Sequence, residues 1–180
     1  MSLVKTLPLL LSLSAALGRV SAWALPNDNE QPIRIQANEA QLDDKQGIAT
    51  SKGDVIITQG SMKITGNTVT ITRNAQGEVD VFTSVGNLAY YEQKPSVDKP
   101  IVQAYAVTIQ YYAAQDRIVL IDKAKVINDG NTTEGEKIVY DTVKQVANAG
   151  RANGANVTAP RPRIDMVIQP KKKTDQQKAQ

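Results

Sequence analysis

Apolar and polar residues alternate along most of this chain, in short segments that end at glycine or at another turn-forming residue. Residues 53–60 and 62–71 form one such module, and residues 118–130 and 134–140 repeat it roughly 70 positions later. A periodicity of two predicts strands with one dry face and one wet face. Its repetition predicts many strands stacked on one another, each too weak to be stable alone.

The rest of the chain extends the same pattern. At about ten residues per strand and turn, it predicts on the order of fifteen strands in one domain. That number exceeds a compact immunoglobulin sandwich and favours a long jelly roll or a stacked β-solenoid. Apolar residues never recur at spacings of three and four over three turns, and 143–149 is the nearest candidate for a helix. Further strands are expected at residues 33–37, 40–47, 78–82, 86–91, 102–112 and 163–168, with a proline-bearing loop at 94–100.

The first 24 residues have the build of a secretory signal peptide. Lys5 supplies the positive end, residues 7–17 the short apolar run, and Ala22-Trp23-Ala24 the small-residue cleavage site. A membrane anchor is disfavoured because a spanning helix needs about 20 apolar residues. We therefore expect cleavage after Ala24 and an exported, soluble chain with one domain at 25–168. Residues 169–180 are expected to be a disordered basic tail, solvated rather than bound to nucleic acid.

The composition removes most catalytic chemistry. The chain contains neither histidine nor cysteine, which excludes Ser-His-Asp triads, thiolate nucleophiles, ordinary zinc sites and disulfides. Glu134 and Glu136 share a strand face at spacing two, as a calcium site or a glycosidase pair would require. This pair keeps one alternative open, an exported carbohydrate-active enzyme of β fold. Otherwise no enzyme activity, metal or cofactor is expected.

The dry face of the predicted strands is rich in Ile, Val and Thr and poor in large aromatics. Phe82 is the only phenylalanine, and Trp23 is lost with the leader. Two sheets with little bulk between them can stand apart and leave an apolar groove that would suit acyl chains. A filled core is the competing interpretation of the same residues.

Residues 53–60, together with 33–38 and 64–67, resemble the OstA-like domain of LptA-type periplasmic lipopolysaccharide-transport proteins. The likeness covers the leader, both modules, the middle loop and the lysine-rich tail. It implies an all-β, open antiparallel β-jelly roll that holds the acyl chains of lipid A and joins end to end across the periplasm to the outer membrane. It also implies lipopolysaccharide, an inner-membrane anchored partner and an outer-membrane translocon of similar fold as partners. Ser51, where relatives usually carry a larger residue, and Asp129-Gly130 in place of Gln-Gly depart from the pattern.

The strand pattern and the resemblance together give the candidate site residues. The expected lipid-binding residues are Ile33, Ile35, Val55, Ile57, Ile64, Phe82, Tyr90, Ile109, Tyr111, Ile118 and Leu120. The first and last strands lack internal proline and carry one charge each, so they are expected to pair with another chain. Such pairing is heterologous and grows a head-to-tail oligomer. Its expected residues are Ile33, Arg34, Ile35, Gln36 and Ala37 on one side and Ile164, Asp165, Met166, Val167 and Ile168 on the other.

Overall fold

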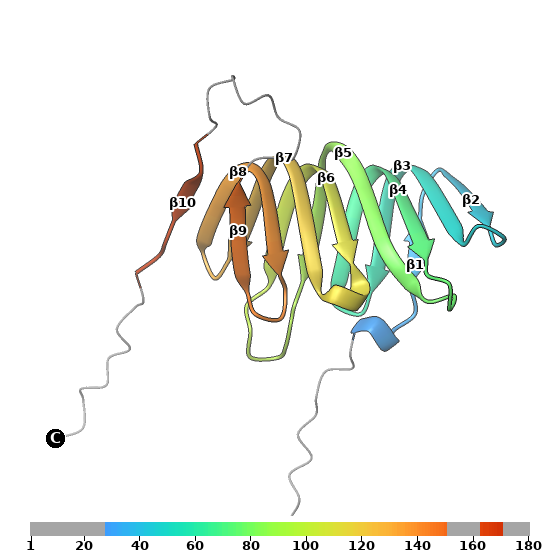
Figure 1. The fold of residues 1–180 in the computed structure, drawn as a ribbon, viewed down its shortest axis with the longest axis horizontal. Coiled ribbons are helices and arrows are strands. Elements are labelled where there is room, and N and C mark those ends of the chain that lie inside the picture. The colour runs from blue at the N-terminus through green and yellow to red at the C-terminus, as the bar shows by residue number, and fades with distance from the viewer. Residues whose placement is uncertain (1–27, 151–162, 171–180) are drawn as a thin grey trace, which may run out of the picture.

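The computed structural model describes residues 28–150 and 163–170 (Figure 1). Within them no helix is long and apolar enough to cross a membrane. The predicted leader at 1–24 and nearly all of the predicted tail lie outside the described residues. Two 3-10 turns, η1 (Asp28–Glu30) and η2 (Ala113–Gln115), accompany the strands. The strands are β1 (Arg34–Gln36), β2 (Glu39–Asp43), β3 (Ile48–Gln59), β4 (Met62–Arg73), β5 (Val79–Gln93), β6 (Val102–Tyr112), β7 (Arg117–Asn128), β8 (Asn131–Asp141), β9 (Val146–Gly150) and β10 (Asp165–Val167).

All of these strands belong to one antiparallel sheet that does not close on itself. Its order is β1-β3-β4-β5-β6-β7-β8-β10, with β2 also paired to β3 and β9 also paired to β8. Each end of the sheet therefore carries two short strands, which cover the two halves of one long strand. The predicted all-β, open antiparallel fold is confirmed, and the first and last predicted strands are confirmed as its edges.

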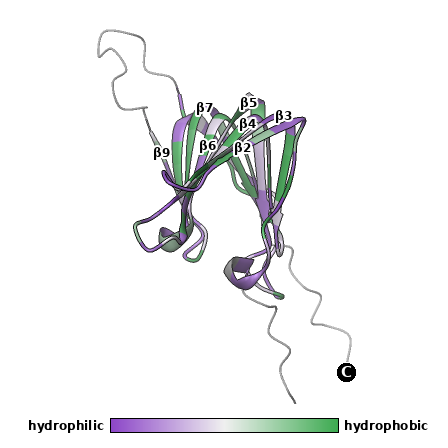
Figure 2. Ribbon diagram, turned by 90° about the vertical axis from the view of Figure 1, so that its right-hand side faces the viewer, coloured by the Kyte–Doolittle hydropathy of each residue, from purple (hydrophilic) through white to green (hydrophobic). Residues whose placement is uncertain are grey.

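The sheet is folded along a crease that crosses every long strand near its middle. Register shifts occur between Lys52 and Val55 in the β3–β4 pairing and recur in the next four pairings along the sheet. Such bulges add a residue to one strand and bend it. Viewed along the stack, the bent strands form a V with two arms (Figure 2). We call them arm A, which contains β1, β10 and the strand halves paired with them, and arm B, which contains β2, β9 and the other halves.

The fold corrects two expectations about the elements. The described residues form ten strands instead of about fifteen, in part because β3 and β5 each continue through a segment where the sequence predicted a break. Gly53 and Gly66 lie at the crease and bend a strand without ending it. The helix candidate at 143–149 is instead a turn followed by β9.

Glycine is required at the crease because the two arms approach closely there. A Cβ atom on Gly66 would lie 2.3 Å from Ser84 Oγ and 3.0 Å from the carbonyl oxygen of Val85. Ser84 Oγ cannot easily move, because it donates a hydrogen bond of 2.9 Å to the Thr65 carbonyl oxygen. A Cβ on Gly135, at the matching position of the second module, would meet nothing closer than 3.8 Å.

We therefore expect Gly66→Ala to lower the free energy of unfolding by about 1–3 kcal/mol, the usual cost of overpacking. Gly135→Ala is the matched control, and it should change stability by less than about 0.5 kcal/mol. Urea unfolding followed by circular dichroism measures both. Equal midpoints for the two variants would contradict this account of the crease.

The pairing keeps equivalent residues level from strand to strand, so side chains form rows along the stack. One row of arm A runs from Ile35 to Met166. In arm B, the inner row that lies far from the crease, near the strand ends, runs from Leu42 to Ala147. Both rows face the inside of the V, and their neighbouring rows face solvent. The buried core of the described residues lies between the arms.

Candidate functional site

The space between the two arms holds nearly all of the predicted lipid-binding residues. The eight candidates on the long strands that face inward belong to one buried cluster: Val55, Ile57, Ile64, Phe82, Ile109, Tyr111, Ile118 and Leu120. Ile35 lies on the same inner face at the end of the sheet, with 40% of its surface exposed, and Ile33 packs against the cluster. The structure thus places these residues on one face, as the alternation predicted.

Tyr90 is the exception, and its predicted inward orientation is wrong. Its ring lies on the outer face against Tyr105, with centroids 4.9 Å apart, whereas Tyr91 is fully buried inside. Strict alternation from Phe82 would place even-numbered residues inside along the whole of β5. The bulge between Val85 and Ala89 shifts this parity, so that odd-numbered residues face inward beyond the crease.

Three buried tyrosines fill the interior, where the sequence predicted few large aromatic side chains. The Tyr111 ring contacts Phe82 in the same arm and Tyr91 in the other, with centroids 6.0 and 5.6 Å apart. Tyr140 is also almost fully buried. The middle of the V is therefore a filled core, and acyl chains could enter it only if the arms separated. Tyr91 and Tyr140 are absent from the predicted site residues. Both could have been found, because each lies two positions after a buried residue of its strand, Ala89 and Ile138.

Open space between the arms is present at the β1–β2 end of the sheet. A mostly apolar groove of about 440 Å³ lies there. We call it the N-terminal mouth. Ser51 lines it, so the small residue that departs from the family pattern lies where an open space is found. The mouth is lined by Ile33, Ile35, Ala37, Ala40, Gln41, Leu42, Gly47, Ala49, Ser51, Ile71, Arg73 and Val79.

Polar side chains gather along the open side of the V, opposite the crease. The Tyr91 hydroxyl donates to Gln93 Oε1 at 2.6 Å, and Gln93 Nε2 donates to Asp28 Oδ2 at 2.8 Å. Asn128 Nδ2, in arm A, donates to the Tyr140 hydroxyl oxygen of arm B at 3.2 Å. We call a set of inward-facing polar residues on this side the polar seam. It consists of Tyr91, Gln93, Tyr111, Asn128 and Tyr140.

Burial controls the protonation of the seam. It raises the pKa of Tyr111 to about 12, helped by the negative charges of Asp116 and Asp28. Burial likewise raises the pKa of Tyr140 to about 12 and that of Tyr91 well above its usual value. All three hydroxyls therefore keep their protons near neutral pH and can act as hydrogen-bond donors.

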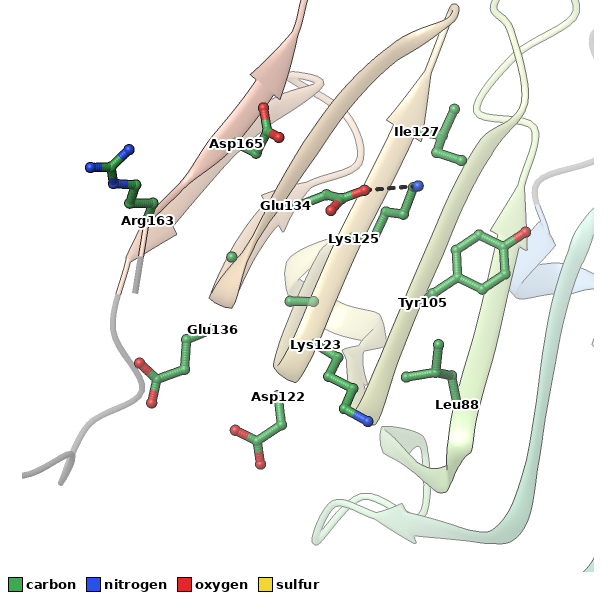
Figure 3. A pocket seen from close by; sticks show the side chains of 12 residues that line it. Leu88, Tyr105, Asp122, Lys123, Lys125, Ile127, Glu134, Glu136, Arg163 and Asp165 are labelled. Carbon is green, nitrogen blue, oxygen red and sulfur yellow. Dashed lines mark ion pairs between the residues drawn. The ribbon is translucent and has the colours of Figure 1, made fainter. Parts of the chain in front are cut away.

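A larger depression, of about 860 Å³, lies on the outer face beside β7, β8 and β10 (Figure 3). Charges of both signs line it, and Lys125 Nζ pairs with Glu134 Oε1 at 2.8 Å. Glu136 points away from this pair in Figure 3, so the two predicted carboxylates do not converge. No cluster of three or more acidic side chains that could hold a metal ion occurs in the part of the chain that the structure describes. The charged lining suits acyl chains less well than the interior does.

The two edges of the sheet present apolar side chains at the ends of the inner face. On β10, Met166 continues the inner row that begins at Ile35, and 57% of its surface is exposed. Ile164 and Ile168, two positions before and two positions after Met166, are also exposed. The predicted charges Arg34 and Asp165 lie in outer rows. A second short strand lies beside each predicted edge strand: β2 at the β1 end of the sheet and β9 at the β10 end. The sequence did not predict that these two strands belong to the edges.

Comparison with known proteins places these features in a family. A family profile described as LptA/(LptD N-terminal domain) LPS transport protein matches residues 34–146. The chain is 64% identical over 173 residues to the lipopolysaccharide export system protein LptH of Pseudomonas aeruginosa, covering 96% of this chain and 99% of that protein. It is 32% identical over 155 residues to the lipopolysaccharide export system protein LptA of Escherichia coli, covering 85% and 83% of the two chains.

A solved structure agrees. The crystal structure of LptH, the LptA homologous periplasmic component of the lipopolysaccharide transport device of P. aeruginosa, superposes with a TM-score of 0.73. The match covers 81% of this chain and all of that one, at 64% identity. The open β-jelly roll, the sequence matches and the family profile agree: this chain belongs to the family of LptA and the LptD N-terminal domain, the lipopolysaccharide transport proteins.

Proposed function

We propose that this protein carries lipopolysaccharide across the periplasm, with the acyl chains held between the two arms of its jelly roll. The observation that supports this most directly is the continuous inner face. The inner row from Ile35 to Met166 runs along the whole stack without a charged side chain, and Thr133 is its member next to Met166. The buried cluster likewise contains no charged side chain. Burial of acyl chains on such a face is favourable at about 0.8 kcal/mol per methylene. The relatives named above are lipopolysaccharide export system proteins, which supports the same role.

The strand directions support a head-to-tail assembly of copies. The sheet places six long strands between its two edges, and each is antiparallel to the next. Consequently β1 runs from the open side toward the crease, while β10 runs from the crease toward the open side. If β10 of one copy meets β1 of the next, the new pair is antiparallel and the apolar rows continue across the joint. Partners of similar fold at the inner and outer membranes would dock at the same edges.

The carbohydrate-enzyme alternative has less support. Its two carboxylates diverge at the outer depression, and the family to which the chain belongs consists of transport proteins. Export by a leader cleaved after Ala24 remains part of the proposal, because those residues lie outside the described structure.

Neighbouring aromatic residues with opposite orientations allow a sharp test. A photo-reactive phenylalanine at Tyr91 or Tyr111 is expected to crosslink purified lipopolysaccharide, because both rings face the inside. The same probe at Tyr90 or Tyr112 faces outward and should give only background labelling. Equal labelling of inner and outer positions, by immunoblot and mass spectrometry, would refute binding between the arms.

A further inference from the structure

One buried hydroxyl of the polar seam has no hydrogen-bond partner within residues 28–150 and 163–170. Tyr111 is 1% exposed, and its Oη atom contacts no donor or acceptor among the residues that the structure describes. The other two tyrosines of the seam are satisfied, Tyr91 by Gln93 and Tyr140 by Asn128. A buried polar group without a partner costs roughly 1–3 kcal/mol and needs a reason. The Tyr111 hydroxyl is therefore the anomaly of the site.

A second unpaired polar atom lies on the opposite arm. Asn128 donates through Nδ2 to Tyr140, but its Oδ1 atom is buried with no partner in the described part of the chain. Tyr111 belongs to β6 in arm B, and Asn128 ends β7 in arm A. An unused donor and an unused acceptor thus come from neighbouring strands and opposite arms.

Both atoms belong to the open side of the V and not to its depth. The carboxylates that act electrostatically on Tyr111 are Asp116, after η2 at the rim of arm B, and Asp28, in η1 at the rim of arm A. Asn128 occupies the last position of β7 before the Asp129-Gly130 turn at the rim of arm A. Toward the crease, the next inner row of arm B contains the buried apolar residues Val69, Ile109, Leu120 and Ile138.

We propose that the polar seam binds the acyl carbonyl groups of the ligand, with the Tyr111 hydroxyl as donor to an ester or amide oxygen. This inference rests on the proposed function and deepens it. Chains that lie deep between the arms must bring their carbonyl linkages to the open side, where the head group meets solvent. Asn128 Oδ1 then accepts from a hydroxyl or amide N–H of the same linkage region. A plain hydrocarbon offers neither group, so the seam distinguishes an acylated ligand from an apolar one.

Single hydroxyl deletions test this with opposite expectations for two similar tyrosines. Tyr111→Phe should weaken lipopolysaccharide binding by about two- to tenfold, the value of one hydrogen bond. It should leave unchanged the binding of diphenylhexatriene, a hydrocarbon fluorophore without hydrogen-bonding groups. Without ligand, its Tm should equal or exceed that of the unaltered chain, because an unpaired buried group is removed. Tyr91→Phe is the matched control. It strands the Gln93 acceptor and should lower Tm by about 2–4 °C.

Infrared spectra of bound lipopolysaccharide give a readout that packing alone does not move. The ester carbonyl band should shift to lower frequency on the unaltered chain, and Tyr111→Phe should abolish part of that shift. If Tyr111→Phe weakens the binding of lipopolysaccharide and diphenylhexatriene equally, or weakens neither, the seam does not bind acyl carbonyl groups. Either result would leave the proposed function itself standing. Failure of the unaltered chain to bind lipopolysaccharide would overturn the proposed function and this inference with it.

Discussion

An aspartate at Ile57 is expected to prevent folding, whereas an aspartate at Ile35 in the same inner row should leave a folded domain. Ile57 is completely buried in the core, and Ile35 is 40% exposed at the N-terminal mouth. A buried carboxylate without a partner adds several kcal/mol to the loss of the isoleucine side chain, for a total above about 5 kcal/mol. That cost matches the whole stability of a typical domain, roughly 5–15 kcal/mol. At Ile35 the charge reaches water, and the cost should be about 1 kcal/mol.

The two variants distinguish a position that holds the fold together from a position that contacts the passing lipid. Circular dichroism and thermal unfolding should find Ile57→Asp unfolded and Ile35→Asp folded with a slightly lower Tm. Lipopolysaccharide binding by folded Ile35→Asp should nevertheless be weaker, because the charge lies in the path of the apolar row. Arg34→Asp, on the outer face of the same strand, is the control and should bind as well as the unaltered chain. Normal binding by Ile35→Asp would argue that the row does not carry the ligand to this mouth.

Removal of residues 163–180 is expected to convert concentration-dependent oligomers into monomers without unfolding the domain. β10 contributes only three paired residues, and its apolar side chains are largely exposed. Its loss should therefore cost little stability while removing the edge that pairs with β1 of the next copy. Light scattering over a range of concentrations measures the change.

A control separates the strand from the basic tail. Replacement of Lys171, Lys172 and Lys173 by alanine keeps β10 and should preserve the oligomers. A monomer at all concentrations in the unaltered chain, or a two-fold dimer that survives the deletion, would contradict head-to-tail growth.

Alternation alone predicted most of the fold, because a period of two is a direct consequence of strand geometry. It assigned Ile57, Ile64 and Ile118 to the interior correctly. The assignment of Tyr90 to the interior came from the family resemblance, and it is wrong because the bulge between Val85 and Ala89 shifts which residues of β5 face inward. The sequence placed Gly86 at the start of a separate strand, whereas it lies at the bulge inside the single strand β5. Glycine signals a special backbone but does not say whether the strand ends there.

The polar seam could not be predicted from the pattern. Gln93 and Asn128 are polar residues at inner positions near strand ends, and in a sequence such residues are indistinguishable from the start of a turn. Asp28, outside every predicted strand, reaches Gln93 across 65 positions of the chain. Only the folded sheet brings these residues to one open side, since their proximity depends on the crease and on the stacking of β5, β6 and β7.

The even number of long strands also constrains how such a module can change its length. Adding or losing one long strand would reverse the direction of one edge and turn an antiparallel joint into a parallel one. Adding a whole hairpin, such as β3–β4 or β7–β8, leaves both edges as they are. The two modules of this chain occupy those two hairpins, four strands apart. Duplication by hairpins would thus lengthen the span of each subunit while keeping it able to join the same neighbours.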